Sequence, residues 1–266
     1  MAAEEKLNLE KRTLIDFEAY LQRIEYRGPL QPSAATLKQL QLAHLLAVPF
    51  ENLSIHRGEP IVLQDAALFE KVVGRRRGGF CYELNGLFCA LLRELGFEVA
   101  MLSAAVMNPE SGFGSQFDHM ALLVTLEQRW LVDVGFGDSF REPLLLDERQ
   151  EQVQGARAYR IDVDGDCFTL WQRDRHGTWT AQYRFDLTPH DYEAYAAMCH
   201  YHQTSPKSHF TQRRVCSRAT TDGRVTLSGT RLITTGGDGQ RQEQELRDEA
   251  EVARVLRQQF GVVLDR

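Results

Sequence analysis

The spacing of apolar residues changes near Phe97, and no other feature of the chain constrains its fold as strongly. Before this point apolar side chains recur every three or four residues, most clearly over 81–95, and Gly96 marks the end of that helix. Beyond it the period becomes two, as expected for strands, at 120–126 and again at 130–136. The sequence therefore predicts an α+β fold in which helices precede an antiparallel barrel or sandwich.

Shorter patterns complete this outline. Ser33 is the expected N-cap of an earlier helix, and the runs 159–163 and 167–172 form a second expected hairpin, followed by a strand over 178–185. A helical stretch begins after Pro189. The chain ends with strand-like patches over 224–235 and a short helix, for which Asp248 is the expected N-cap.

Composition excludes several classes of protein. With 266 residues and 43% hydrophobic content, the chain can form one large domain or two to three small ones. Its net charge of −6 gives no general attraction for nucleic acid or an anionic membrane. Five cysteines without a CxxC pair argue against a disulfide framework and a zinc site. The N-terminal residues contain no apolar leader, and no apolar run approaches the roughly 18 residues of a membrane helix, so we expect a cytoplasmic protein.

Cys81 is the cysteine most suited to chemistry. The sequence RRRGGFC brings its thiol through two glycines to the start of the amphipathic helix, where free N–H groups favour an anion. A cationic partner there would lower the pKa of the thiol further. Each of the other four cysteines is expected to be structural.

A cysteine nucleophile needs a base, and the base needs a group that orients it. His119 begins an apolar strand, and the next strand contains Asp133 between two valines, where a buried carboxylate requires a cation or donors. A hairpin centred on Gln128 places both side chains on one face, but separates them by four positions, roughly 13 Å along the strand. We therefore expect a bulge, strong coiling or a shifted turn. Asp118 points to the other face and is the weaker candidate.

Three separated segments resemble the catalytic segments of the arylamine N-acetyltransferases. They are RGGFCYELNGLF around Cys81, FDHMALLV around His119 and LVDVGFG around Asp133. The resemblance extends to VPFENLSIHRGEPI, TPHDYEAY and SPKSHFTQR, so that it spans most of residues 30–215. It implies a helical bundle at 1–96, a β-barrel at 97–188, a helical linker at 189–210 and an α/β lid at 211–266, with a cysteine-protease-like core.

The resemblance also implies a reaction. An acetyl group would pass from acetyl-CoA to Cys81 and then to an aromatic amine or hydrazine, with His119 as the base and Asp133 orienting it. The Cys81 N–H is the natural oxyanion donor. No metal is implied, and neither is a nucleic-acid or membrane partner; the oligomeric state stays open.

Further residues are assigned to substrates. Phe136 and Phe80 offer flat apolar surfaces to an arene. The resemblance implies that CoA contacts the backbone at Gly135 and Gly137. No acidic residue occurs between Ala194 and Thr221, and this locally basic stretch contains the matching SPKSHF segment. We therefore expect Ser208 and Phe210 to be further contacts of CoA.

Glu51, Arg77 and Asn85 are expected to support the site. An ion pair between Glu51 and Arg77 would brace the loop before Cys81, and Asn85, one helical turn beyond the cysteine, would add a hydrogen bond.

Three alternatives remain. A papain-like thiol hydrolase or amidase would use the same three residues, although the papain-type signature CG[SA]C[WY] is absent. An amide synthase of the same family would join a bound acyl chain to an arylamine. A non-enzymatic arene-binding protein would retain an inert triad.

Overall fold

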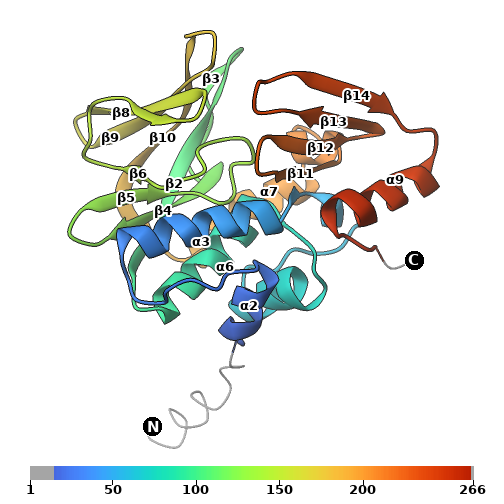
Figure 1. Cartoon of the computed structure of the whole chain (residues 1–266), viewed down its shortest axis with the longest axis horizontal. Helices are drawn as coiled ribbons and strands as arrows, with labels where there is room; N and C mark the ends of the chain where they lie inside the picture. Colours follow the sequence, from blue (N-terminus) through green and yellow to red (C-terminus); the bar gives the residue numbers. More distant parts are fainter. Residues whose placement is uncertain (1–14, 265–266) are drawn as a thin grey trace, which may run out of the picture.

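The structure, a computed structural model, describes residues 15–264 and combines helices with two antiparallel sheets (Figure 1). The first fourteen residues of the predicted helical segment lie outside the described part. Helices dominate the first third, and their bounds are α2 Phe17–Arg23, α3 Ala34–Ala47, α4 Leu53–His56, α5 Asp65–Phe69, the π-helical turn η1 Glu70–Gly74 and α6 Cys81–Glu94. Two more helices, α7 Tyr192–Thr204 and α8 His209–Gln212, follow the larger sheet.

The predicted helices α3 and α6 are confirmed. Ser33 accepts a hydrogen bond from the Thr36 backbone N–H at 3.1 Å, which caps α3 as expected. Gly96 follows α6 with φ of +88°, a left-handed conformation in which glycine avoids a steric penalty. The α6 side chains predicted to form the core are fully buried at Leu84, Leu87, Phe88, Leu91 and Leu92.

The larger sheet forms a nearly closed antiparallel barrel, one of the two arrangements that the spacing of apolar residues predicts. Its strand order is β6-β5-β4-β2-β10-β9-β8-β7, with β3 pairing with β2. Their bounds are β2 Glu98–Asn108, β3 Gly112–Phe113, β4 His119–Thr125, β5 Arg129–Val132, β6 Leu144–Leu145, β7 Gln152–Gln154, β8 Arg157–Asp164, β9 Cys167–Arg173 and β10 Trp179–His190. Helix α6 packs against β2 and β4, and this contact brings Cys81, the first residue of the helix, to the barrel.

The two edges of the barrel meet through glutamine side chains. The Gln152 amide accepts from the Leu145 N–H at 2.8 Å and donates to the Leu145 carbonyl at 2.9 Å. The Gln154 amide accepts from the Arg141 N–H at 2.9 Å and donates to the Glu142 carbonyl at 2.7 Å. Side-chain amides thus replace the backbone ladder between β6 and β7.

The second sheet has the order β1-β11-β12-β13-β14, and α9 packs with it (Figure 1). The bounds are β1 Phe50–Glu51, β11 Val215–Ala219, β12 Arg224–Ser228, β13 Arg231–Thr235, β14 Arg241–Glu245, α9 Glu249–Val255 and the π-helical turn η2 Leu256–Phe260. Asp248 caps α9 as predicted, accepting from the Glu251 N–H at 2.8 Å. Strand β1 comes from the helical part of the chain and pairs with β11. The sequence did not predict this pairing, because a strand of two residues is too short to show a periodic pattern.

The predicted register of the first hairpin is wrong by two residues. The closing pair is Thr125↔Arg129, so the turn centres on Glu127 rather than Gln128. A shift of two keeps every side chain on its predicted face, so the hydrophobic pattern could not distinguish the two registers. Pairing stops at Leu122↔Val132, and Asp133 lies beyond the end of the strand.

Candidate active site

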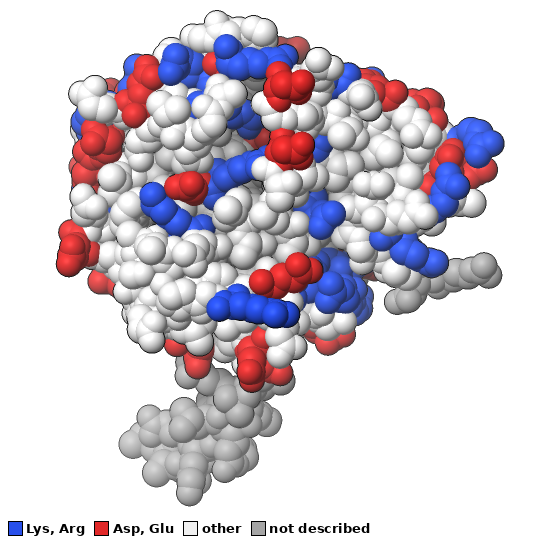
Figure 2. All heavy atoms as spheres, viewed as in Figure 1, with Lys and Arg blue, Asp and Glu red and all other residues white. Residues whose placement is uncertain are grey.

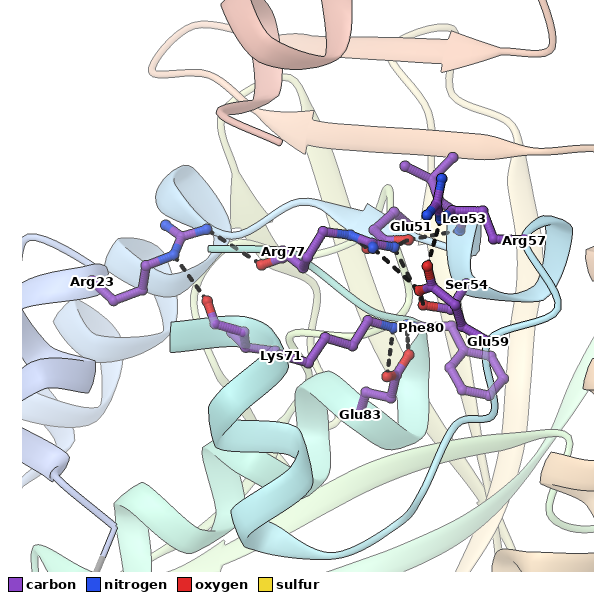
Figure 3. A network of polar contacts seen from close by, with 11 residues as sticks. Arg23, Glu51, Leu53, Ser54, Arg57, Glu59, Lys71, Arg77, Phe80 and Glu83 are labelled. Carbon is purple, nitrogen blue, oxygen red and sulfur yellow. Dashed lines mark hydrogen bonds and ion pairs between the residues drawn. The ribbon is translucent and has the colours of Figure 1, made fainter. Parts of the chain in front are cut away.

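Cys81 is the first residue of α6, and an acid–base pair holds that end of the helix. Glu83 accepts a hydrogen bond from the Phe80 N–H at 3.1 Å and an ion-pair contact from Lys71 Nζ at 2.7 Å (Figure 3). Both side chains of the ion pair are buried, and Lys71 comes from the η1 turn. The start of α6 is therefore fixed by the hydrogen bond that Glu83 accepts from the Phe80 N–H. The negative charge of Glu83 is balanced by Lys71 of the η1 turn.

The predicted pair between Glu51 and Arg77 is present and buried. Arg77 Nε lies 2.9 Å from Glu51 Oε1, and the carboxylate also accepts from the Leu53 N–H at 2.6 Å (Figure 3). Burial raises the pKa of Glu51, but the charges of Lys71 and Arg77, together with these hydrogen bonds, hold it below its usual value. A Cβ at Gly78 would lie 1.9 Å from the Pro49 carbonyl, so the loop before Cys81 passes too close to its neighbour for any side chain there.

His119 and Asp133 form a direct contact, with 2.7 Å between His119 Nε2 and Asp133 Oδ2. Both side chains are buried. Two features bring these side chains together. The turn is shifted, as expected, and β5 ends early, so that Asp133 leaves the strand ladder and turns toward His119. Asp118, the weaker candidate, lies instead 3.7 Å from His202.

Donors from four separate segments satisfy the Asp133 carboxylate. Besides His119, it accepts from Asn85 Nδ2 at 2.9 Å, from the Gly135 N–H at 2.8 Å and from the Tyr183 hydroxyl at 3.1 Å. The predicted requirement for donors around a buried carboxylate is thus met.

Asn85 and Gly135 connect this carboxylate to the nucleophile. Asn85 lies one turn beyond Cys81 on α6, and its side chain also donates to the Met120 carbonyl at 2.6 Å and accepts from the Val134 N–H at 2.9 Å. A Cβ at Gly135 would lie 2.8 Å from Cys81 Cα, so this backbone is packed directly on Cys81. The structure therefore gathers Cys81, His119 and Asp133 at the contact between α6 and the barrel.

The helix start does not by itself make Cys81 an anion. Burial raises the pKa of the Cys81 thiol well above its usual value, the backbone N–H of Met120 opposes that rise, and the charge of Asp133 adds to it. The expected lowering by the helix end is therefore outweighed by burial. A thiolate at this position requires an adjacent cation.

The two aromatic candidates differ in exposure. Phe136 is half-buried, and its ring centroid lies 5.1 Å from that of His119 in an edge-to-face arrangement. Phe80 is fully buried and packs edge-to-face against Tyr82 and Phe210. The prediction that Phe80 contacts an arene is therefore wrong for this structure, because its ring forms core and leaves no free surface.

The predicted CoA residues have varied surroundings. Gly135 is buried, as described above, whereas Gly137 has φ of +92° and open space around it. Ser208 is 3% exposed, and its hydroxyl contacts His202 Nδ1 at 3.1 Å and accepts from the Phe210 N–H at 3.3 Å, so it offers no free group to a phosphate. That prediction is corrected. Phe210 is half-buried in the aromatic cluster with Phe80.

The basic stretch is partly used inside the protein. Arg214 pairs with Glu249 at 2.7 Å, and Arg218 donates to the Leu46 and Gln259 carbonyls. Lys207 and Arg213 are exposed. On the face shown in Figure 2, basic and acidic side chains are interspersed.

Two contacts of Asp133 were not predicted from the sequence. Gln41 on α3 accepts a hydrogen bond from the Asp133 N–H at 3.3 Å, and Tyr183 on β10 contacts the carboxylate. Nothing in the local pattern around Gln41 or Tyr183 signals these contacts, because both depend on the packing of distant segments.

The comparisons agree on one family. A family model described as N-acetyltransferase matches residues 33–266. The arylamine N-acetyltransferase of Escherichia coli (strain K12) is 33% identical over 92% of this chain and 88% of its own. Arylamine N-acetyltransferase 2 of Mus musculus is 33% identical over 95% and 96%.

The chain belongs to the arylamine N-acetyltransferase family.

It is thus an acetyltransferase, as the resemblance predicted. The structure of the Mycobacterium marinum arylamine N-acetyltransferase in complex with CoA superimposes with a TM-score of 0.86 at 34% identity, covering 93% of each chain. Within residues 15–264, no cluster of three or more His, Cys, Asp or Glu residues could hold a metal ion. No helix in the same range is long and apolar enough to span a bilayer.

Proposed function

We propose that this protein transfers an acetyl group from acetyl-CoA to arylamines and hydrazines through an acetyl-cysteine on Cys81. The observation that carries the proposal is the buried 2.7 Å contact between His119 Nε2 and Asp133 beside the nucleophile helix. Membership of the family supports the substrate class, and the Mycobacterium marinum complex with CoA supports the donor.

The imidazole provides the cation that a buried thiolate requires. Because Nε2 contacts Asp133, Nδ1 is the ring nitrogen available to take the thiol proton. The Cys81 sulfur then attacks the thioester carbonyl, the Cys81 N–H at the helix start stabilises the oxyanion, and CoA leaves with a proton. The amine nitrogen attacks the acetyl-cysteine in the second half, and His119 accepts the proton that it loses.

Phe136 is the proposed arene contact because its partly exposed ring lies against the base. Gly135, Gly137 and Phe210 stay proposed contacts of CoA, and the segments 1–96, 97–188, 189–210 and 211–266 stay proposed units, the last acting as a lid on a cysteine-protease-like core. A papain-like hydrolase, an amidase and an amide synthase are the rival activities, and each would also form an acyl-enzyme.

The test is a single-turnover assay with acetyl-CoA and no acceptor. We expect release of one CoA per protein molecule, with one acetyl group on the peptide that contains Cys81, and product only after an aniline or hydrazide is added. The variant Cys81→Ala should release no CoA. Cys89→Ala is the matched control, because Cys89 is a buried cysteine on the same helix. Continuous CoA release without an acceptor would indicate a hydrolase, and turnover by Cys81→Ala would refute the covalent mechanism.

A further inference from the structure

Two arginines connect the barrel and the C-terminal sheet, and each belongs to one of these units and contacts a loop of the other. Arg141, from the loop that follows Asp133, donates to the carbonyls of Thr220 at 2.8 Å and Thr221 at 3.1 Å in the turn between β11 and β12. Arg224, the first residue of β12, reaches back to Asp138 Oδ1 at 3.1 Å and also donates to the Gly137 carbonyl. Each unit therefore inserts a guanidinium into a loop of the other.

Asp138 joins this exchange to the wall of the barrel. Arg157 on β8 contacts both carboxylate oxygens of Asp138, at 2.8 Å each, while Arg224 contacts Oδ1. We name these three residues the Arg157–Asp138–Arg224 bridge. Its arginines hold the pKa of Asp138 below its usual value against the opposing effect of burial.

The bridge lies at the edge of a cavity between the two units. This cavity has a volume of about 690 Å³, and its lining includes Leu42 of α3, the bridge residues and the β11–β12 turn. The Arg224 side chain is 14% exposed, so its contacts are largely removed from water, whereas that of Asp138 is 53% exposed. Partial burial makes the Arg224 contacts stronger than ordinary surface pairs.

The bridge holds the backbone that carries the proposed arene contact. Gly137 follows Phe136 directly and, as a glycine with φ of +92° and open space where a Cβ would lie, has no side chain of its own to anchor it. The Gly137 carbonyl is instead held by Arg224. On the other side of Phe136, the backbone is packed on Cys81 through Gly135.

We propose that Arg224 is a positioning residue of the C-terminal sheet that fixes Phe136 against His119 and thereby sets the affinity for the aromatic acceptor. The kinetic part of this proposal rests on the proposed acetyl transfer. The structural part concerns only the mobility of residues 134–141 and can be tested separately.

Hydrogen exchange followed by mass spectrometry tests the structural part on the full chain. In Arg224→Ala, we expect amides of peptides covering 134–141 to exchange about tenfold faster, since charge-assisted hydrogen bonds to this loop are lost. Asp138→Asn, which leaves Arg224 and its contact with Gly137 in place, should give a smaller increase. Arg214→Ala is the matched control, because Arg214 makes two bonds to Glu249 inside the C-terminal unit and none to the loop. Equal exchange of 134–141 in wild type and Arg224→Ala would overturn the proposal.

Kinetics test the positioning role. We expect Arg224→Ala to raise KM for an aniline about tenfold while the rate of Cys81 acetylation at saturating acetyl-CoA stays within about twofold, and Arg224→Lys, which retains one charged donor, to recover part of the loss. A matching KM increase in Arg214→Ala, or a loss confined to acetylation, would refute the role. If the wild-type protein transfers no acetyl group at all, the proposed function fails. Hydrogen exchange would still show whether Arg224 restrains residues 134–141.

Discussion

His44 should make this protein lose stability as the pH falls below about 6.5. The imidazole is fully buried on α3, with Nδ1 2.8 Å from the Tyr20 hydroxyl and its ring against Phe88. Burial, helped by the charge of Arg23, lowers the pKa of His44 to about 3. The unfolded chain binds this proton near pH 6.5 and the folded chain does not, so protonation favours unfolding between those two values.

The size of the effect follows from the shift. One proton of difference costs about 1.4 kcal/mol per pH unit, so this histidine removes about 3 kcal/mol of the free energy of unfolding between pH 6.5 and 4. The substitution His44→Asn retains a polar partner for Tyr20 but has no titrating ring. It should be about 2 kcal/mol less stable at pH 8, because contacts with Phe88 are lost, and should then lose stability less steeply on acidification.

Urea unfolding followed by circular dichroism at several pH values between 8 and 4 measures both curves. Carboxylates titrate in wild type and variant alike, so the difference between the two curves isolates His44. Tyr20→Phe is the control: it loses about 1 kcal/mol at every pH but leaves the ring buried, so its slope should match that of wild type. If the free energy of unfolding of His44→Asn fell with pH as steeply as that of wild type, the reasoning would be refuted, because His44 would then be charged in the folded protein.

Two further substitutions would perturb the packing around Cys81. Gly135→Ala should reduce acetylation of Cys81 by at least about tenfold, since a Cβ there must push the Cys81 backbone away; equal rates in a single-turnover assay would contradict this. Asn85→Leu should lower the free energy of unfolding by about 3 kcal/mol, because the Met120 carbonyl, the Val134 N–H and Asp133 each lose a buried partner; a loss below about 1 kcal/mol in urea unfolding would show that these groups find other partners.

The sequence predicted most of what depends on local pattern. The capped start of α3, the core face of α6 and the face shared by His119 and Asp133 each follow from spacing within a short segment. The pairing of His119 with Asp133 followed from parity along two strands and from the cost of burying a carboxylate.

The errors arose where distant segments decide the outcome. Two hairpin registers satisfied the same pattern, and the pattern alone could not select the observed one, which closes at Thr125↔Arg129. Phe80 and Ser208 looked available for ligands because a sequence does not show that α7 and α8 cover them. The pKa of Cys81 depends on total burial, which the helix start alone could not predict.

The glutamine seam between β6 and β7 affects how the barrel meets other chains. An edge strand with free N–H and C=O groups is a template on which a second molecule can add a strand. Here the side chains of Gln152 and Gln154 already occupy backbone groups over 141–145, so a visiting strand would have to displace them first. Two amide side chains thus protect a nearly closed barrel against edge-to-edge aggregation without requiring full backbone closure.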